Sequence, residues 1–150
     1  MITISTKLLF SSYQDKEKVL NLMRRWSSAM RYAYKRLLEG MEINTLRKLI
    51  QSTFGLNSRY SHSAIVKAQA LIKVRKEKGQ SLKKAIFGGR DIFRKLQKRH
   101  INGKDYQRLK IQFQERRKGN LYSMGQANCK GNQNTRIEVK ENGTYLRITT

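Results

Sequence analysis

One long amphipathic pattern constrains this fold more than any other feature of the sequence. Ser12, followed by Asp15, is a variant of the capping box that begins helices, and Gly40 supplies the signal that ends one. We therefore predict a helix of about 25 residues with one face on a core. The apolar residues that recur on this face at steps of three and four are Val19, Leu22, Met23, Trp26, Met30, Ala33, Tyr34 and Leu37.

Signals of the same kind predict further helices along the middle of the chain. We expect Asn44 to cap a helix that runs to Phe54 before Gly55, and Asn57 or Ser58 to cap one that runs to Lys78 before Gly79. The other expected ranges are Asp91 to His100, and Asn102 or Gly103 to Lys118. Short connections between the first three helices imply a small bundle. The adjacent Gly88 and Gly89 mark a turn at which the backbone can approach another group closely.

Strand signals lie at both ends of the chain. Ile2 to Phe10 combines β-branched residues with an apolar run. Two β-type runs, 134–140 and 144–149, flank Asn142-Gly143, a pair that supplies positive φ for a tight hairpin. We predict an α+β fold, in which a small β-barrel or antiparallel sheet, built from the N-terminal strand and the C-terminal hairpin, carries an inserted helical bundle. The expected boundaries are 1–12 for the first strand, 13–118 for the helical insertion and 119–150 for the remaining strands.

The charge balance indicates the kind of partner. The chain has 33 Lys and Arg against 10 Asp and Glu, a formal net charge of +23. Such self-repulsion destabilises a compact state, and a polyanion relieves it, so nucleic acid is the expected partner. A merely soluble basic protein and a cationic protein of membrane surfaces are the alternatives.

The basic excess is densest between Lys73 and Lys118, with 17 basic and four acidic residues. It lacks the interleaved acids that pairing along a helix face would supply. We therefore expect these helices to bind phosphates. The nucleic-acid-binding residues predicted in this stretch are Lys73, Arg75, Arg90, Arg94, Lys98, Arg99, Arg108, Arg116, Arg117 and Lys118.

The sequence gives no sign of catalytic, metal or cofactor chemistry. His62 and His100 have no evident carboxylate partner, and the single Cys129 can form neither a disulfide framework nor a zinc site. All three aspartates, Asp15, Asp91 and Asp105, are explained by helix N-termini, where a negative charge is favourable. The first residues lack the pattern of a signal peptide, and no apolar run is long enough to span a membrane. We expect a binding protein, not an enzyme, in the cytoplasm and associated with the nucleoid.

Five segments, taken in order and spacing, resemble the N-terminal half of TnpB proteins, which are relatives of the type V CRISPR effectors and are often labelled transposases. The segments are Arg31-Tyr32-Ala33-Tyr34, Leu56-Asn57-Ser58-Arg59, Phe87-Gly88-Gly89-Arg90, Leu121-Tyr122-Ser123-Met124-Gly125 and Lys130-Gly131-Asn132. The resemblance implies a wedge β-barrel with an inserted helical recognition lobe, which together grip a guide-RNA scaffold and the guide–target heteroduplex. It places five residues in segments expected near nucleic acid: Arg59, Arg90, Tyr122, Lys130 and Asn132.

The departure from that family also carries an expectation. TnpB proteins continue into a RuvC-like nuclease with three separated acids and a zinc ribbon, whereas this chain ends at Thr150. Cleavage is therefore not carried over, and a separate nuclease half is a conceivable partner beside RNA and a DNA target. An excised half, a truncated reading frame and a split subunit remain open, as does the preference between RNA and DNA. A structural ribonucleoprotein component of ribosomal type and a DNA-binding repressor are the rival functions.

Overall fold

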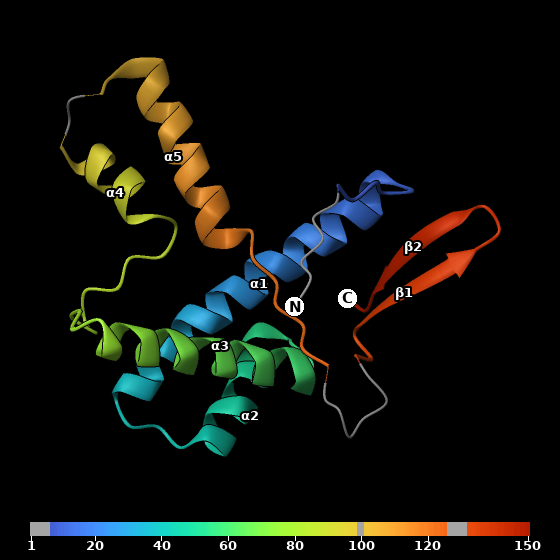
Figure 1. The fold of residues 1–150 in the computed structure, drawn as a ribbon, viewed down its shortest axis with the longest axis horizontal. Coiled ribbons are helices and arrows are strands. Elements are labelled where there is room, and N and C mark those ends of the chain that lie inside the picture. Colours follow the sequence, from blue (N-terminus) through green and yellow to red (C-terminus); the bar gives the residue numbers. More distant parts are fainter. Residues whose placement is uncertain (1–6, 99–100, 126–131) are drawn as a thin grey trace.

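A computed structural model describes residues 7–98, 101–125 and 132–150 of the chain. Figure 1 shows helices gathered around a central bundle, with a separate helix pair on one side and a β-hairpin on the other. The elements of the described residues are α1 (Tyr13–Leu38), α2 (Ile43–Phe54), α3 (Ser58–Glu77), α4 (Arg90–Gln97), α5 (Gly103–Lys118), β1 (Thr135–Lys140) and β2 (Gly143–Ile148). The α+β class with a small antiparallel sheet is confirmed, and these helices all fall within the predicted insertion, 13–118.

The core lies where α1, α2 and α3 meet. Trp26 of α1, Leu46 and Ile50 of α2, and Tyr60 and Ile65 of α3 are fully buried. The apolar stripe predicted on α1 faces this core, with Met23 and Leu37 only half-buried and its other members buried. Burial of this much apolar surface is the main source of stability in such a bundle.

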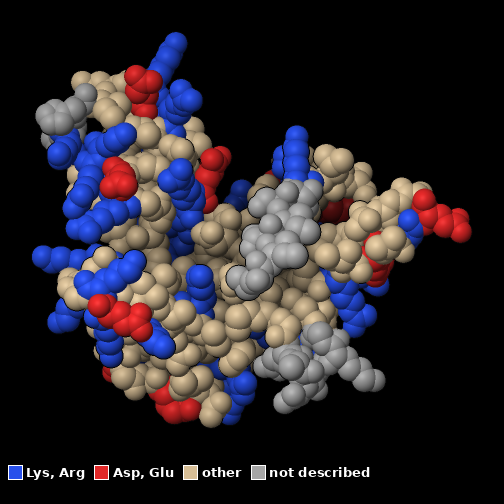
Figure 2. Space-filling view, in the orientation of Figure 1, with Lys and Arg blue, Asp and Glu red and all other residues tan. Residues whose placement is uncertain are grey.

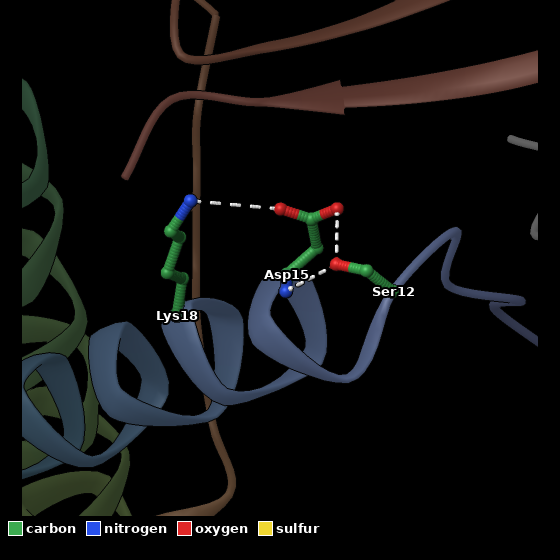
Figure 3. Close-up of polar contacts among 3 residues, drawn as sticks. All are labelled: Ser12, Asp15 and Lys18. Carbon is green, nitrogen blue, oxygen red and sulfur yellow. Dashed lines mark hydrogen bonds and ion pairs between the residues drawn. The ribbon is translucent and has the colours of Figure 1, made fainter.

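Side chains at the starts of α1 and α3 follow the local signals, whereas the start of α2 does not, and Asn102 makes no side-chain capping hydrogen bond at the start of α5. Ser12 Oγ accepts a hydrogen bond from the Asp15 amide at 3.1 Å, and Asp15 also pairs with Lys18 at 3.6 Å (Figure 3). Asn57 caps α3. The prediction that Asn44 caps the second helix is wrong: the Glu42 carboxylate occupies that position and accepts from the backbone two and three residues ahead.

α4 and α5 form an antiparallel pair that projects from the bundle, and we call residues 90–118 the arm (Figure 1). The Phe93 and Phe113 rings lie 5.8 Å apart at its centre. Gly88, at φ +104, lies so close to the Phe113 carbonyl oxygen that a Cβ on it would come within 2.8 Å. The predicted turn at Gly88-Gly89 thus lets the connecting backbone pack directly on α5. α4 ends at Gln97, short of the predicted end, and the last two residues of that prediction lie outside the described residues.

β1 and β2 form the predicted C-terminal hairpin. Lys140 pairs with Gly143, so the two turn residues are Glu141 and Asn142. The prediction that Gly143 lies in the turn is therefore off by one position, since Gly143 is the first residue of β2. The Tyr60 hydroxyl donates to the Thr149 carbonyl at 3.0 Å and holds the base of the hairpin against α3.

The predicted N-terminal strand is not formed in its described part. Residues 7–12 contain no strand, and Leu9 is 88% exposed. The remainder of the prediction, residues 1–6, lies outside the described residues. The sheet of the described chain has two strands, an antiparallel sheet in place of the barrel alternative. β propensity in residues 7–10 has no effect here because a strand forms only where a neighbour takes up its backbone hydrogen bonds.

Candidate nucleic-acid interface

Exposed cations cover the arm and the end of α3 that leads to it. Figure 2 shows Lys and Arg side chains gathered on that side of the molecule, with few acidic side chains among them. Eight of the predicted basic site residues are exposed: Lys73, Arg90, Arg94, Lys98, Arg108, Arg116, Arg117 and Lys118. Among the described residues from 73 to 118, one ion pair forms, between Lys73 and Glu77 at 4.0 Å. Most of this positive charge is therefore available to an external anion.

Two of the three acidic residues of the arm lie at its helix starts, and the third, Glu115, lies near the end of α5. Asp91 is in the first turn of α4 and Asp105 in the first turn of α5, as predicted, and both are exposed. Within the described ranges, no group of three or more His, Cys, Asp or Glu side chains is placed to hold a metal ion. No described helix is long and apolar enough to cross a membrane.

Arg75 forms hydrogen bonds within the protein. Its guanidinium donates to the Ser81 carbonyl at 3.2 Å through Nε and to the Lys84 carbonyl at 3.4 Å through Nη2. These bonds fold the connection after α3 back toward its last turns. Arg75 thus positions the segment that leads into the arm, and less of its hydrogen-bonding capacity faces solvent than that of its neighbours.

Arg31 anchors the other end of the arm, a role that the sequence reasoning missed. Its Nη1 donates to the Arg117 carbonyl at 2.6 Å and so ties the last turn of α5 to α1. Half-burial lowers the pKa of the Arg31 guanidinium, and the charge of Arg117 lowers it further. Two like charges are held together here because the α5 C-terminus offers unpaired carbonyl oxygens.

Residues 119–125, which we call the strap, run from the arm across α1 and α3 (Figure 1). At α1, the buried Ser27 hydroxyl donates to the main-chain carbonyl of Asn120 at 2.9 Å and accepts from the main-chain N–H of Asn120 at 3.1 Å. At α3, the buried Ser63 hydroxyl donates to the Tyr122 carbonyl at 2.8 Å. Two small polar residues on otherwise apolar helix faces therefore bind the strap where it crosses.

Tyr122 is exposed on this strap. Lys67 Nζ lies 4.8 Å from the centroid of its ring, within cation–π range. The residue remains 46% exposed despite this contact. Of the described predicted site residues that follow the arm, Tyr122 is exposed and Asn132 is half-buried.

Asn132 links the strap to the hairpin. Its Oδ1 accepts from the Asn134 amide at 3.0 Å and the Thr135 amide at 3.2 Å, while its Nδ2 donates to Ser123 Oγ at 2.8 Å. The side-chain amide of Asn132 is therefore already hydrogen-bonded within the protein at the start of β1. Arg59 is half-buried in the first turn of α3, near the base of the hairpin, so the structure does not bring it together with the arm. The predicted Arg99 and Lys130 lie outside the described residues, as does Cys129.

Comparison with known proteins gives one match. The whole chain, residues 1–150, matches the family model described as the SSO2105 N-terminal domain. Neither a curated protein nor a solved structure matches the chain.

Proposed function

The chain belongs to the SSO2105 N-terminal domain family, and we propose that it binds nucleic acid along its arm. The observation that carries this proposal is the scarcity of ion pairs on a surface crowded with Lys and Arg: the described part of 73–118 contains one. Exposed like charges at this density raise the free energy of the folded protein. Phosphates along a nucleic-acid backbone reverse the sign of that interaction and release counterions.

We further propose that the nucleic acid is a structured RNA and its heteroduplex with DNA, held by the chain as part of a TnpB-like RNA-guided system. The five segments that resemble TnpB support this, as does an arrangement in which helices precede a β-hairpin. On this proposal the chain grips RNA in the cytoplasm near the nucleoid, recognises a DNA target through that RNA, and carries out no cleavage itself.

The first experiment measures how RNA binding depends on salt. If about six to ten phosphates are contacted, the affinity of the unaltered protein should fall by roughly 10³ to 10⁵ between about 50 and 200 mM salt. Two triple variants each remove three positive charges, one from the arm and the other from surfaces outside it. The arm variant is Arg94→Gln, Lys98→Gln, Arg108→Gln, and its control, on the exposed surfaces of α1 and α2, is Lys16→Gln, Lys35→Gln, Lys48→Gln.

The arm variant should reduce the slope of log affinity against log salt by about 2 to 3, since each lost phosphate contact contributes roughly 0.7 to 0.9. The control variant should leave the slope nearly unchanged. Equal effects of the two variants would show that net charge alone matters and would contradict an interface on the arm. A shallow salt dependence of the unaltered protein would contradict phosphate binding altogether.

A second experiment identifies the bound nucleic acid by sequencing what co-purifies with the protein. One discrete structured RNA encoded near the gene supports the RNA-guided proposal. Bulk ribosomal RNA instead supports a structural ribonucleoprotein component, and preferential retention of duplex DNA supports a repressor. Magnesium-dependent cutting by the isolated chain, abolished by changing Asp91 or Asp105, would contradict the expectation that this chain is not an enzyme.

A further inference from the structure

We propose that Tyr122 and Lys67 form a stacking site for one unpaired nucleobase, separate from the phosphate-binding arm. The inference rests on the proposed function, because it assigns a second contact to the same nucleic-acid ligand. Tyr122 offers an aromatic ring that is 46% exposed, and Lys67 brings a positive charge to within 4.8 Å of the ring centroid. Aromatic rings beside cations are the usual contacts of single-stranded nucleic acid.

The ring is held in place by the backbone that carries it. The Tyr122 carbonyl accepts from Ser63, which is 3% exposed and is itself bonded to Trp26 in the core. The strap is fixed on both sides of this point, by Ser27 at Asn120 and by Asn132 at Ser123. An aromatic side chain on a fixed main chain loses little conformational entropy when a base stacks on it.

The charge around the ring favours a nucleotide over an apolar protein segment. Lys67 lies on α3, the helix that carries Arg59 at its start and Lys73 nearer its end. A stacked base places its own phosphate within reach of such cations. The base must be unpaired because a base inside a duplex already has neighbours on both of its faces.

A second exposed tyrosine provides an internal comparison. Tyr145 on β2 is 42% exposed, and Lys140 Nζ lies 5.3 Å from its ring centroid. In the hairpin register, however, Tyr145 is opposite Glu138, and Glu141 follows Lys140 directly. Glu141 repels phosphate, and Glu138 neutralises Arg147 in an ion pair at 3.3 Å, so Tyr145 has the same exposed aromatic chemistry without the electrostatic setting for a nucleotide.

The test uses an RNA hairpin with a short unpaired extension that contains 2-aminopurine, and a blunt hairpin with the same stem; in both, a non-nucleotide linker replaces the loop, so that the extension carries the only unpaired bases. The variants are Tyr122→Ala, the conservative Tyr122→Phe, and the control Tyr145→Ala. Tyr122→Ala keeps the main-chain carbonyl that Ser63 binds, so the strap should remain in place; far-ultraviolet circular dichroism checks the fold.

We expect Tyr122→Ala to weaken binding of the extended hairpin by roughly 5- to 150-fold and to abolish the quenching of 2-aminopurine. Binding of the blunt hairpin should hardly change, and Tyr122→Phe and Tyr145→Ala should behave like the unaltered protein. Unchanged binding by Tyr122→Ala, or an equal loss for both RNAs, would overturn this inference while leaving the arm proposal intact, provided that the arm variant still weakens both RNAs. Failure of the unaltered protein to bind either RNA would overturn both.

Discussion

Replacement of Ser63 by alanine removes a single oxygen atom, but it should destabilise this protein more than so small a change suggests. The Ser63 hydroxyl accepts from Trp26 Nε1 at 3.0 Å and lies within hydrogen-bond distance of two carbonyl oxygens, those of Tyr60 and Tyr122. A hydroxyl has one hydrogen, so only one of the two carbonyls receives it at a time. The Tyr60 carbonyl lies inside α3, where helical hydrogen bonding satisfies it. The bond that matters is therefore the one to the strap.

The expected loss in the free energy of unfolding has two parts. Trp26 is 1% exposed, so its indole N–H would be left buried without a partner, at a cost of about 1–3 kcal/mol. The strap would lose one hydrogen bond, which contributes about 0.5–1.5 kcal/mol. Together these give roughly 1.5–4.5 kcal/mol, a large share of the stability of a small domain.

Urea unfolding followed by far-ultraviolet circular dichroism measures this loss. Ser52→Ala is the control: Ser52 is exposed and also bonds a carbonyl within its own helix, so its replacement should change stability by less than about 0.5 kcal/mol. In a Trp26→Phe background the indole donor is absent, and Ser63→Ala should then cost only the strap bond. A cost for Ser63→Ala below about 0.5 kcal/mol, or the same cost in both backgrounds, would refute this reasoning.

Two further predictions test local features of the fold. Gly88→Ala should detach the arm, because φ is +104 and the new Cβ would lie 2.8 Å from the Phe113 carbonyl oxygen, and amide hydrogen exchange should therefore accelerate across the arm. Gly79→Ala is the control: nothing lies within 4 Å of its Cβ position, so it should cost only the roughly 1–2 kcal/mol of backbone strain. Equal exchange in the two variants would contradict the steric argument. Glu42→Ala should lower the melting temperature, since hydrogen bonds from two backbone amides lower the pKa of this carboxyl and the ionised form stabilises α2. That contribution is complete above about pH 4.3 and is lost as the pH falls through the lowered pKa, so the two melting temperatures should converge in acid, and a constant difference would contradict the cap.

Local signals located the helices well because they act over short stretches of chain. The Ser12 cap, the apolar stripe around Trp26 and the glycine after α2 each depend on residues within about four positions of one another. Glu42 was missed as a cap because asparagine is the more common capping residue, and Asn44 lies nearby. Which of two neighbouring residues caps a helix depends on the backbone geometry, which the sequence does not show. The described part of the predicted first strand, residues 7–10, forms no strand for a different reason: its partner strand had to come from elsewhere in the chain.

For the candidate interface too, one part could be predicted from local sequence and another could not. The exposed basic surface could be predicted, because 17 basic residues cannot be neutralised by the four acidic residues of the same stretch. Which cations remain free could not be predicted. Arg75 binds carbonyls of the next connection, and Arg31, not marked by any sequence pattern, ties α5 to α1.

The helical framework, the hairpin and the basic stretch could be read from the amino-acid sequence, since each depends on residues near one another along the chain. The way in which these parts are joined depends instead on contacts between distant segments. Ser27 reaches Asn120 across 93 positions, and Ser63 reaches Tyr122 across 59. A serine within an apolar stripe has no local signature, because its hydrogen-bond partner is brought to it by the packing of the whole chain. These two hydroxyls place the exposed Tyr122 ring on α3 beside Lys67, and therefore fix the second contact proposed for nucleic acid.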